Sequence, residues 1–180
     1  MSENEQQAQF ERLVLPHLDA AYNLARWLTR REHDAEDVVQ EAYLRAFNAF
    51  DQFHGGDAKF WLLKIVRNTC YTWLAKNRRK EAAEAFDETV HDVASSAFDP
   101  QVILEQQIDS AALRKAIEEL PVEFREVLIL REFEGLSYQQ VASVADLPVG
   151  TVMSRLARAR ARLAEALGAK GQREVAHELP

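Results

Sequence analysis

The sequence predicts an all-α protein in which two small helical domains are joined by an acidic, flexible linker. Apolar residues recur at helical spacing on both sides of this linker, and strand-like alternation is almost absent. We assign the first domain to residues 1–80, the linker to 81–110, the second domain to 111–170 and a polar tail to 171–180. A chain of 180 residues is long enough for two such domains.

The composition excludes several classes of protein. With 47% hydrophobic residues and few Gly and Pro, the chain is expected to fold rather than stay disordered. The single cysteine, Cys70, rules out an internal disulfide and is expected to be a buried structural residue. No apolar run reaches the roughly 20 residues of a membrane span, and the acidic start lacks the features of a signal peptide. We therefore expect a cytoplasmic protein without membrane insertion.

The net charge of −7 hides an uneven distribution of charged residues. Residues 1–58 carry 5 basic and 11 acidic side chains, whereas residues 59–80 carry 7 basic and no acidic ones. Residues 81–113 carry 8 acidic and no basic side chains, and residues 114–180 carry 10 of each. Because exposed charges are screened over roughly 8 Å at physiological salt, local patches decide where a polyanion can bind.

The run DAEDVVQEAYLRAF, residues 34–47, predicts an amphipathic helix that Asp34 caps. Its core stripe is expected to consist of Val39, Tyr43 and Phe47 and to continue to Phe50. The opposite face combines acceptors, one cation and one exposed leucine: Asp37, Gln40, Glu41, Leu44 and Arg45. From the residues alone, this face fits either a solvated surface or a partner site.

A second run, WLLKIVRNTCYTWLAKNRRK, predicts a helix over residues 61–80 with a basic outer face. Leu62, Val66, Thr69 and Trp73 form its core side. The outer side combines cations, an amide and an aromatic ring, in Lys64, Arg67, Asn68, Tyr71 and Arg78, with Trp61 at its edge and Arg79 and Lys80 at its end. Such a face suits single-stranded nucleic acid, because cations hold phosphates and rings stack on bases. A membrane-surface helix or a solvated basic face would fit the same pattern.

The second domain shows the outline of a helix-turn-helix. Ser137 and Gln140 form a capping-box pattern at the start of one helix, and Pro148 lies in the first turn of the next. The last helix directs short polar groups and arginines away from its apolar stripe: Thr151, Ser154, Arg158 and Arg162. Arginines can bind guanine edges or phosphates in the major groove. A helical hairpin with an arginine-rich exposed side is the simpler alternative.

In three ordered segments, the chain resembles the extracytoplasmic-function (ECF) class of the sigma-70 family of RNA polymerase sigma factors. DAEDVVQEAYLRAF is similar to conserved region 2.2, and WLLKIVRNTCYTWLAKNRRK is similar to regions 2.3 and 2.4. LPVEFREVLILREFEGLSYQQVASVADLPVGTVMSRLARARARL is similar to region 4. The resemblance implies a region 2-like helical bundle followed by a region 4-like helix-turn-helix.

This resemblance implies a role for each exposed face. The residues implied to bind the β′ clamp helices of core polymerase are Asp37, Gln40, Glu41, Leu44 and Arg45. Those implied to hold or melt the −10 element are Trp61, Lys64, Arg67, Asn68, Tyr71, Arg78, Arg79 and Lys80. Those implied to contact the −35 element are Arg131, Pro148, Gly150, Thr151, Ser154, Arg155, Arg158 and Arg162. For Arg131, base reading and phosphate binding both stay open.

The resemblance also implies partners: core RNA polymerase, through the β′ clamp helices and the β flap, promoter DNA, and an anti-sigma factor. The acidic linker would then either mimic RNA near the exit path or act as a plain spacer. We expect no enzymatic activity, cofactor or metal, because the histidines are scattered and no phosphate loop or nucleophile motif occurs. The rival hypothesis is a stand-alone helix-turn-helix regulator, which would need neither the 37–45 face nor the 61–80 helix.

Overall fold

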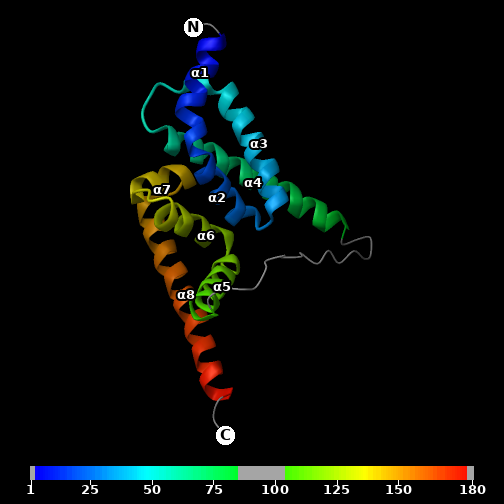
Figure 1. Ribbon diagram of the computed structural model, residues 1–180, viewed down its shortest axis with the longest axis vertical. Helices are drawn as coiled ribbons and strands as arrows, with labels where there is room; N and C mark the ends of the chain where they lie inside the picture. Colours follow the sequence, from blue (N-terminus) through cyan, green and yellow to red (C-terminus); the bar gives the residue numbers. More distant parts are fainter. Residues whose placement is uncertain (1–2, 85–103, 178–180) are drawn as a thin grey trace.

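The computed structural model describes residues 3–84 and 104–177, with side chains at 3–84 and 110–168. Throughout these ranges the chain is helical, with short turns and without a strand, so the all-α prediction is confirmed. Figure 1 shows a bundle of helices at the N-terminal end of the molecule and a long helix, α8, that runs to the C-terminal end. The middle of the predicted linker, residues 85–103, lies outside the described residues.

The first domain is a bundle of four α-helices with two short 3₁₀ turns. Its elements are α1 (Glu3–Val14), η1 (Leu15–His17), α2 (Leu18–Thr29), α3 (Glu32–Asn48), η2 (Phe50–Gln52) and α4 (Ala58–Glu84). Helices α2, α3 and α4 pack against one another around Leu24, Leu28, Leu62, Leu63 and Val66, which are fully buried. Burial of each such side chain stabilises the fold by about 1.5–3 kcal/mol. For Val66 this gain outweighs the lower helix propensity of a β-branched residue.

Two sequence predictions about α3 need correction. The helix begins at Glu32, two residues before Asp34, because Arg30 adopts a left-handed conformation (φ 70°) that ends α2 and reverses the chain at once. Asp34 therefore lies inside the first turn and does not cap the helix. Its negative charge still interacts favourably with the positive end of the helix dipole. Phe47 is 39% exposed rather than in the core, although Phe10 of α1 packs edge-on against its ring.

The second domain contains four α-helices and a π-helical turn. They are α5 (Leu104–Glu118), α6 (Val122–Leu128), η3 (Ile129–Phe133), α7 (Tyr138–Ala145) and α8 (Val149–His177). Helix α5 begins inside the segment assigned to the linker, and α8 continues into the segment assigned to the tail. Arg125, which is buried, donates to the carbonyls of Glu118 and Leu120 and so completes the C-terminal end of α5.

The helix-turn-helix is present in α7 and α8, as predicted. Ser137 caps α7, and its capping box with Gln140 is complete, with bonds of 2.9 and 3.1 Å between each side chain and the other's backbone amide. Asp146 takes a left-handed conformation (φ 55°) that ends α7. Pro148 lies one residue before α8 rather than within its first turn, and its carbonyl accepts from Val152 N at 3.1 Å.

The two domains pack directly against each other in this conformation. Helix α4 contacts α7, and α2 contacts α6, so the buried residues of both domains form one continuous cluster. In Figure 1 the short helices α6 and α7 lie beside the first-domain bundle, while α8 extends away from it alongside α5. The sequence predicted two domains and a linker, but it predicted nothing about this packing.

Candidate protein and nucleic-acid interfaces

The exposed face of α3 carries all five residues that the sequence indicated as a protein-binding surface. Asp37, Gln40, Glu41, Leu44 and Arg45 are exposed, because Ala35, Val38, Ala42 and Ala46 take the core side of the helix. Small alanines on that side let α3 lie close to α2 and α4. The structure therefore presents the predicted face to solvent as one continuous surface.

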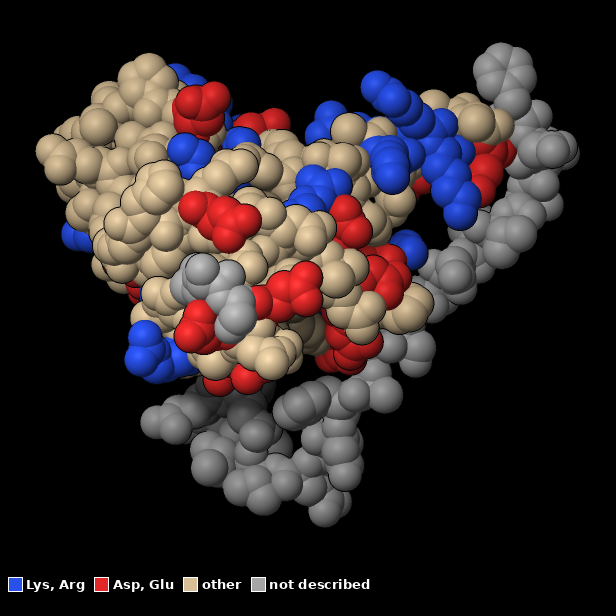
Figure 2. All heavy atoms as spheres, turned by 90° about the horizontal axis from the view of Figure 1, so that it is seen from above, with Lys and Arg blue, Asp and Glu red and all other residues tan. Residues whose placement is uncertain are grey.

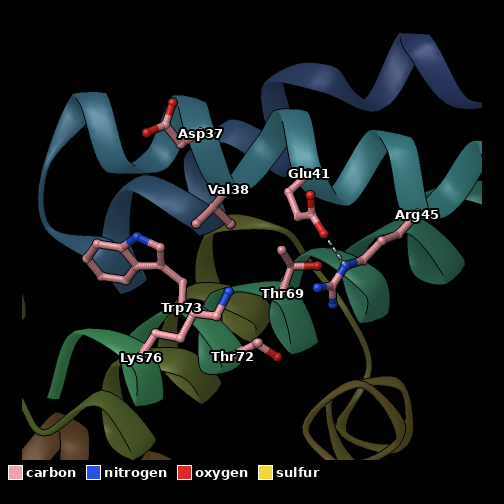
Figure 3. A pocket seen from close by; sticks show the side chains of 8 residues that line it. All are labelled: Asp37, Val38, Glu41, Arg45, Thr69, Thr72, Trp73 and Lys76. Carbon is pink, nitrogen blue, oxygen red and sulfur yellow. Dashed lines mark hydrogen bonds and ion pairs between the residues drawn. The ribbon is translucent and has the colours of Figure 1, made fainter. Parts of the chain in front are cut away.

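The packing of α3 divides this surface into two rows. Asp37, Glu41 and Arg45 line a hollow of about 220 Å³ between α3 and α4. Figure 3 shows Glu41 and Arg45 of α3 directed toward each other beside Thr69 of α4, Trp73 and Lys76 at the other end of the hollow, and Asp37 pointing away from α4. Within the row, Arg45 Nε donates to Glu41 Oε1 at 2.8 Å. The hollow is thus lined by the Asp37 carboxylate, by the Glu41–Arg45 ion pair and by the Trp73 ring. This combination suits a polar protein partner.

Gln40 and Leu44 face the other side, toward α1. They line a shallow apolar groove together with Phe10, Leu15 and Phe47. Leu44 is 63% exposed, the largest value among the exposed large apolar side chains of the described residues. Exposed apolar residues that cluster along one groove are typical of a protein-interaction site. Leu15 and Phe47 were not in the predicted set, and only their exposure in the fold identifies them.

The predicted nucleic-acid face of α4 is partly free and partly occupied. Lys64 and Asn68 are exposed on its outer side. Arg78, Arg79 and Lys80 are exposed at its C-terminal end, and Figure 2 shows Lys and Arg side chains gathered over this end of the molecule. Such a concentration of cations attracts a phosphate backbone.

Trp61 occupies a structural position at the edge of this face. Its ring packs against Phe53, with ring centroids 5.1 Å apart, and against Phe50 at 6.2 Å. It is half-buried, so one part of the indole remains available to solvent. These aromatic contacts restrict the orientation of the ring.

Arg67 and Tyr71 are not free in this conformation, because both bind Glu126 of α6. Arg67 Nε donates to Glu126 Oε1, and Tyr71 OH donates to Glu126 Oε2, each at 2.5 Å. The Arg67 guanidinium lies 3.9 Å from the centroid of the Tyr71 ring. We call these three residues the Glu126 cluster. Nothing in the sequence pattern indicated that Glu126 has a special role, because a single charged residue on a helix is common.

The Glu126 cluster changes the ionisation of its members. Burial lowers the pKa of Arg67, but the hydrogen bond and the charge of Glu126 outweigh burial, so the pKa is raised overall. Burial and then the Glu126 charge raise the pKa of Tyr71 well above its ordinary value. Burial, with a smaller contribution from Glu126, raises the pKa of the neighbouring Cys70 thiol to about 12. Arg67 thus stays charged and Tyr71 stays neutral at physiological pH.

Helix α8 presents its predicted contact face to solvent. Val152, Leu156 and Ala159 are buried against α6 and α7. The opposite side exposes Gly150, Ser154, Arg158 and Arg162, while Thr151 and Arg155 are half-buried. Pro148, just before the helix, is also exposed. Arg162 lies over the Phe124 ring at 5.1 Å. The start of α8 therefore offers short polar groups, and its following turns offer arginines, in the order that a recognition helix needs.

Arg131 has internal partners. Its Nη1 donates to the Leu136 carbonyl at 2.7 Å, and its guanidinium lies 4.7 Å from the centroid of the Tyr138 ring. These contacts support the turn before α7. Arg131 as a whole is half-exposed, and its guanidinium has further N–H donors that can bind a phosphate.

Comparisons with known proteins identify the family. The "Sigma-70 region 2" model matches residues 13–80, and the "Sigma-70, region 4" model matches residues 110–163. The RNA polymerase sigma-H factor of Pseudomonas aeruginosa is 37% identical over 169 residues, which cover 88% of this chain and 86% of that protein. The ECF RNA polymerase sigma factor SigE of Mycolicibacterium smegmatis is 34% identical over 93% of this chain, which spans 64% of that relative.

Solved structures show the same architecture. The sigma factor RpoE of Bartonella quintana, determined with the anti-sigma factor NepR, matches with a TM-score of 0.72 and 31% identity, over 89% of this chain and 97% of that one. CnrH, determined with the cytosolic domain of CnrY, matches with a TM-score of 0.63 and 27% identity, over 91% and 90%. The chain therefore belongs to the ECF class of the sigma-70 family. No helix in the described parts of the chain could span a membrane.

Proposed function

We propose that this protein is an ECF sigma factor that binds core RNA polymerase, directs it to specific promoters and helps to melt the −10 element. The observation that carries the proposal is the match to the sigma-H factor, which extends over most of both chains and includes both sigma segments in order. The exposed faces of α3, α4 and α8 support it, because each has the chemistry that one step of initiation needs.

In this proposal, α3 binds the polymerase. The hollow beside Asp37 and Glu41 takes polar groups of the β′ clamp helices, and the groove beside Leu44 takes an apolar side chain. Desolvated apolar contacts at the centre and polar contacts at the rim are typical of protein interfaces. Helix α8 and its neighbours would approach the β flap.

In the same proposal, α4 and α8 bind the promoter. Asn68 pairs with an extruded base, Trp61 holds the edge of the melted region, and Arg78, Arg79 and Lys80 bind phosphates. Extruding a base costs a few kcal/mol, which a pocket and phosphate contacts can offset. Helix α8 reads duplex DNA upstream through Ser154 and Arg158. The −10 contacts of α4 and the upstream contacts of α8 act together, because the linker holds both sites on one chain.

Control by an anti-sigma factor is part of this proposal. Two similar structures are complexes, one with the anti-sigma factor NepR and the other with the cytosolic domain of CnrY. The same surfaces of this chain would be covered by such a partner. A cytoplasmic location follows from the proposal, because the factor must meet polymerase and DNA there.

Co-elution with bacterial core RNA polymerase tests the proposal. The native chain should co-elute with core, and the triple variant Asp37→Ala, Gln40→Ala, Glu41→Ala should not. A matched control replaces two acids and one glutamine elsewhere in the first domain, through Glu3→Ala, Gln52→Ala and Glu81→Ala, all at exposed positions. The control should bind core as the native chain does.

The opposite result would support a different class of protein. If the native chain shifts duplex DNA but does not bind core, it is a stand-alone helix-turn-helix regulator. The roles proposed for Asn68 and Trp61 would then be withdrawn, since a regulator of that class has no need to melt DNA.

A further inference from the structure

Two large apolar side chains are exposed at the start of α8. Val149 is 38% exposed and Met153 is 53% exposed. Because they are four residues apart, they lie on one side of the helix, one turn apart. Neither is among the buried residues of the core or the half-buried apolar residues that pack against it. The hydrophobic core therefore accounts for neither side chain. We call Val149 and Met153 the apolar pair.

Gly150, beside the apolar pair, also lacks an internal explanation. It lies in the first turn of α8, and a Cβ atom at this position would meet no packed neighbour within 4 Å. Glycine is a poor helix former, and no close contact inside the chain requires it here. An exposed glycine allows another molecule to approach the backbone closely. Gly150 thus points independently to a ligand that meets the start of α8 at short range.

The charges around the apolar pair fit a polyanionic ligand. Between residues 149 and 164 the sequence contains four arginines and no acidic residue. Arg158 is exposed one turn beyond Ser154, and the nearby acid Glu132 of η3 is paired with Arg160. A surface of this charge attracts the phosphates of nucleic acid. The apolar pair therefore lies on the same helix face as the cations that the proposed function places on duplex DNA.

The chemistry of the major groove indicates what an apolar side chain could read there. Base pairs present hydrogen-bond donors and acceptors in this groove, and thymine also presents its C5 methyl group. An apolar side chain gains free energy when it buries this methyl group. Against a guanine edge or an amino group, the same side chain would bury polar atoms without a partner. Methionine is flexible and polarisable, so Met153 can adapt its shape to a methyl group.

We propose that Met153, with Val149 beside it, is a specificity-determining residue that reads the methyl group of a thymine in the upstream duplex. Ser154 and Arg158 hydrogen-bond to neighbouring base pairs or phosphates, and Gly150 lets the helix approach closely. The preferred duplex then contains an A·T pair next to the pairs that the polar side chains read. This inference rests on the proposed function, since it takes the binding of duplex DNA by α8 from there.

Replacement of single thymines by deoxyuridine tests this inference, because the two bases differ only in the C5 methyl group. Selection from a random duplex library with the full native chain first gives the preferred sequence. Each thymine of that duplex is then replaced in turn, and affinities are measured by fluorescence anisotropy at fixed salt. The test variants are Met153→Ala and Met153→Leu. The control is Leu167→Ala, at a 37% exposed position of the same helix, about 20 Å further along its axis.

For the native chain, one thymine-to-deoxyuridine replacement should lower the affinity about fourfold, the effect of one buried methyl group. Met153→Ala should bind the thymine duplex more weakly and should bind both duplexes equally well at that position. Met153→Leu should keep most of the difference, because its side chain remains large and apolar. Leu167→Ala should discriminate as the native chain does. A merely structural role of Met153 would change both affinities by the same factor.

Val149→Ala is the second test variant, and it should reduce the discrimination without abolishing it. Circular dichroism identifies any variant that fails to fold, and the inference is then judged on the folded variants and on the native chain with its deoxyuridine series.

Equal affinity of the native chain for every deoxyuridine duplex would overturn the inference. A difference that Met153→Ala leaves unchanged would overturn it as well. In both cases sequence-selective binding of duplex DNA would persist, so the upstream role proposed for α8 would stand. A chain that selects no duplex sequence would refute that role and this inference together.

Discussion

At the scale of single residues, Glu126 has the most consequential environment in the protein. It lies on α6 among apolar side chains, yet it binds Arg67 and Tyr71 of α4. Cys70, which lies between Arg67 and Tyr71 in the sequence of α4, is fully buried. The same burial that forces Glu126 to find partners removes Cys70 from solvent.

Cys70 should be chemically inert in the folded protein. Burial, followed by the nearby Glu126 charge, raises its pKa to about 12, so the thiol is protonated at pH 8 and inaccessible to reagent. With a thiol-reactive chromogenic disulfide, we expect no reaction in native buffer and one equivalent after denaturation in guanidinium. The Asn48→Cys variant should react once in native buffer, which controls for the reagent. Rapid reaction of native Cys70 would contradict its burial.

At the scale of elements, α8 shows how one helix buries one side in the core and leaves the other side exposed for the proposed DNA contacts. Val152, Leu156 and Ala159 repeat at helical spacing and bury one side, which leaves the other side for polar contacts. The capped turn before it fixes where the helix begins, and hence which residues lie at its exposed start.

Replacement of Arg158 by alanine should weaken binding to the cognate upstream duplex by about 1–3 kcal/mol. Arg158 is exposed on α8 and can reach a base edge or a phosphate without breaking an internal contact. The measurement is fluorescence anisotropy at fixed salt, because the electrostatic part of the affinity depends strongly on salt. Arg12→Ala, an exposed charge on α1, is the matched control and should change little. An unchanged affinity for Arg158→Ala would remove this residue from the contact set.

At the scale of the whole molecule, the two domains form one packed body whose boundary carries charge. Two sets of contacts hold α4 and α2 of one domain against α6 and the end of η3 of the other: the Glu126 cluster, and Glu134 with Lys59 and Asn23. The linker makes this contact intramolecular, which raises the effective concentration of each domain for the other. A modest set of contacts can therefore keep the chain closed.

The closed conformation should lose stability above pH 10. Burial and the Glu126 charge raise the pKa of Tyr71 in the closed chain, with Glu123 adding slightly and Arg67 opposing. Opening returns this pKa toward its ordinary value of about 10. Since the raised pKa favours the protonated phenol, the stabilisation is fully present below about pH 10 and declines as pH rises toward the closed-state pKa.

Energy transfer between dyes attached to Asn48→Cys and Ala164→Cys, exposed positions in the first and second domain, measures this loss from pH 9 to about pH 11. Tyr71→Phe is the matched variant, because it keeps the ring and removes the ionising hydroxyl. Its transfer should fall less over this range than that of the native chain. Equal pH dependence in the two proteins would show that Tyr71 does not couple ionisation to closure.

The sequence alone determined the helical class, the capped turn at Ser137 and the exposed faces of α3 and α8. These features depend on local propensity and on hydrophobic period, which neighbouring residues encode. Sequence pattern also predicted the basic outer face of α4, of which Lys64, Asn68 and the C-terminal cations are indeed exposed. The start of α3 was misplaced, because a left-handed Arg30 is not visible in a periodic pattern.

Only the tertiary structure decided that Arg67 and Tyr71 would face Glu126. These residues are separated by 59 and 55 positions from their partner, and no local rule connects residues so far apart. The same holds for Glu134 with Lys59, 75 residues away. Helical period states which side of a helix is polar, but the packing of one domain on the other determines whether that side meets solvent or a carboxylate.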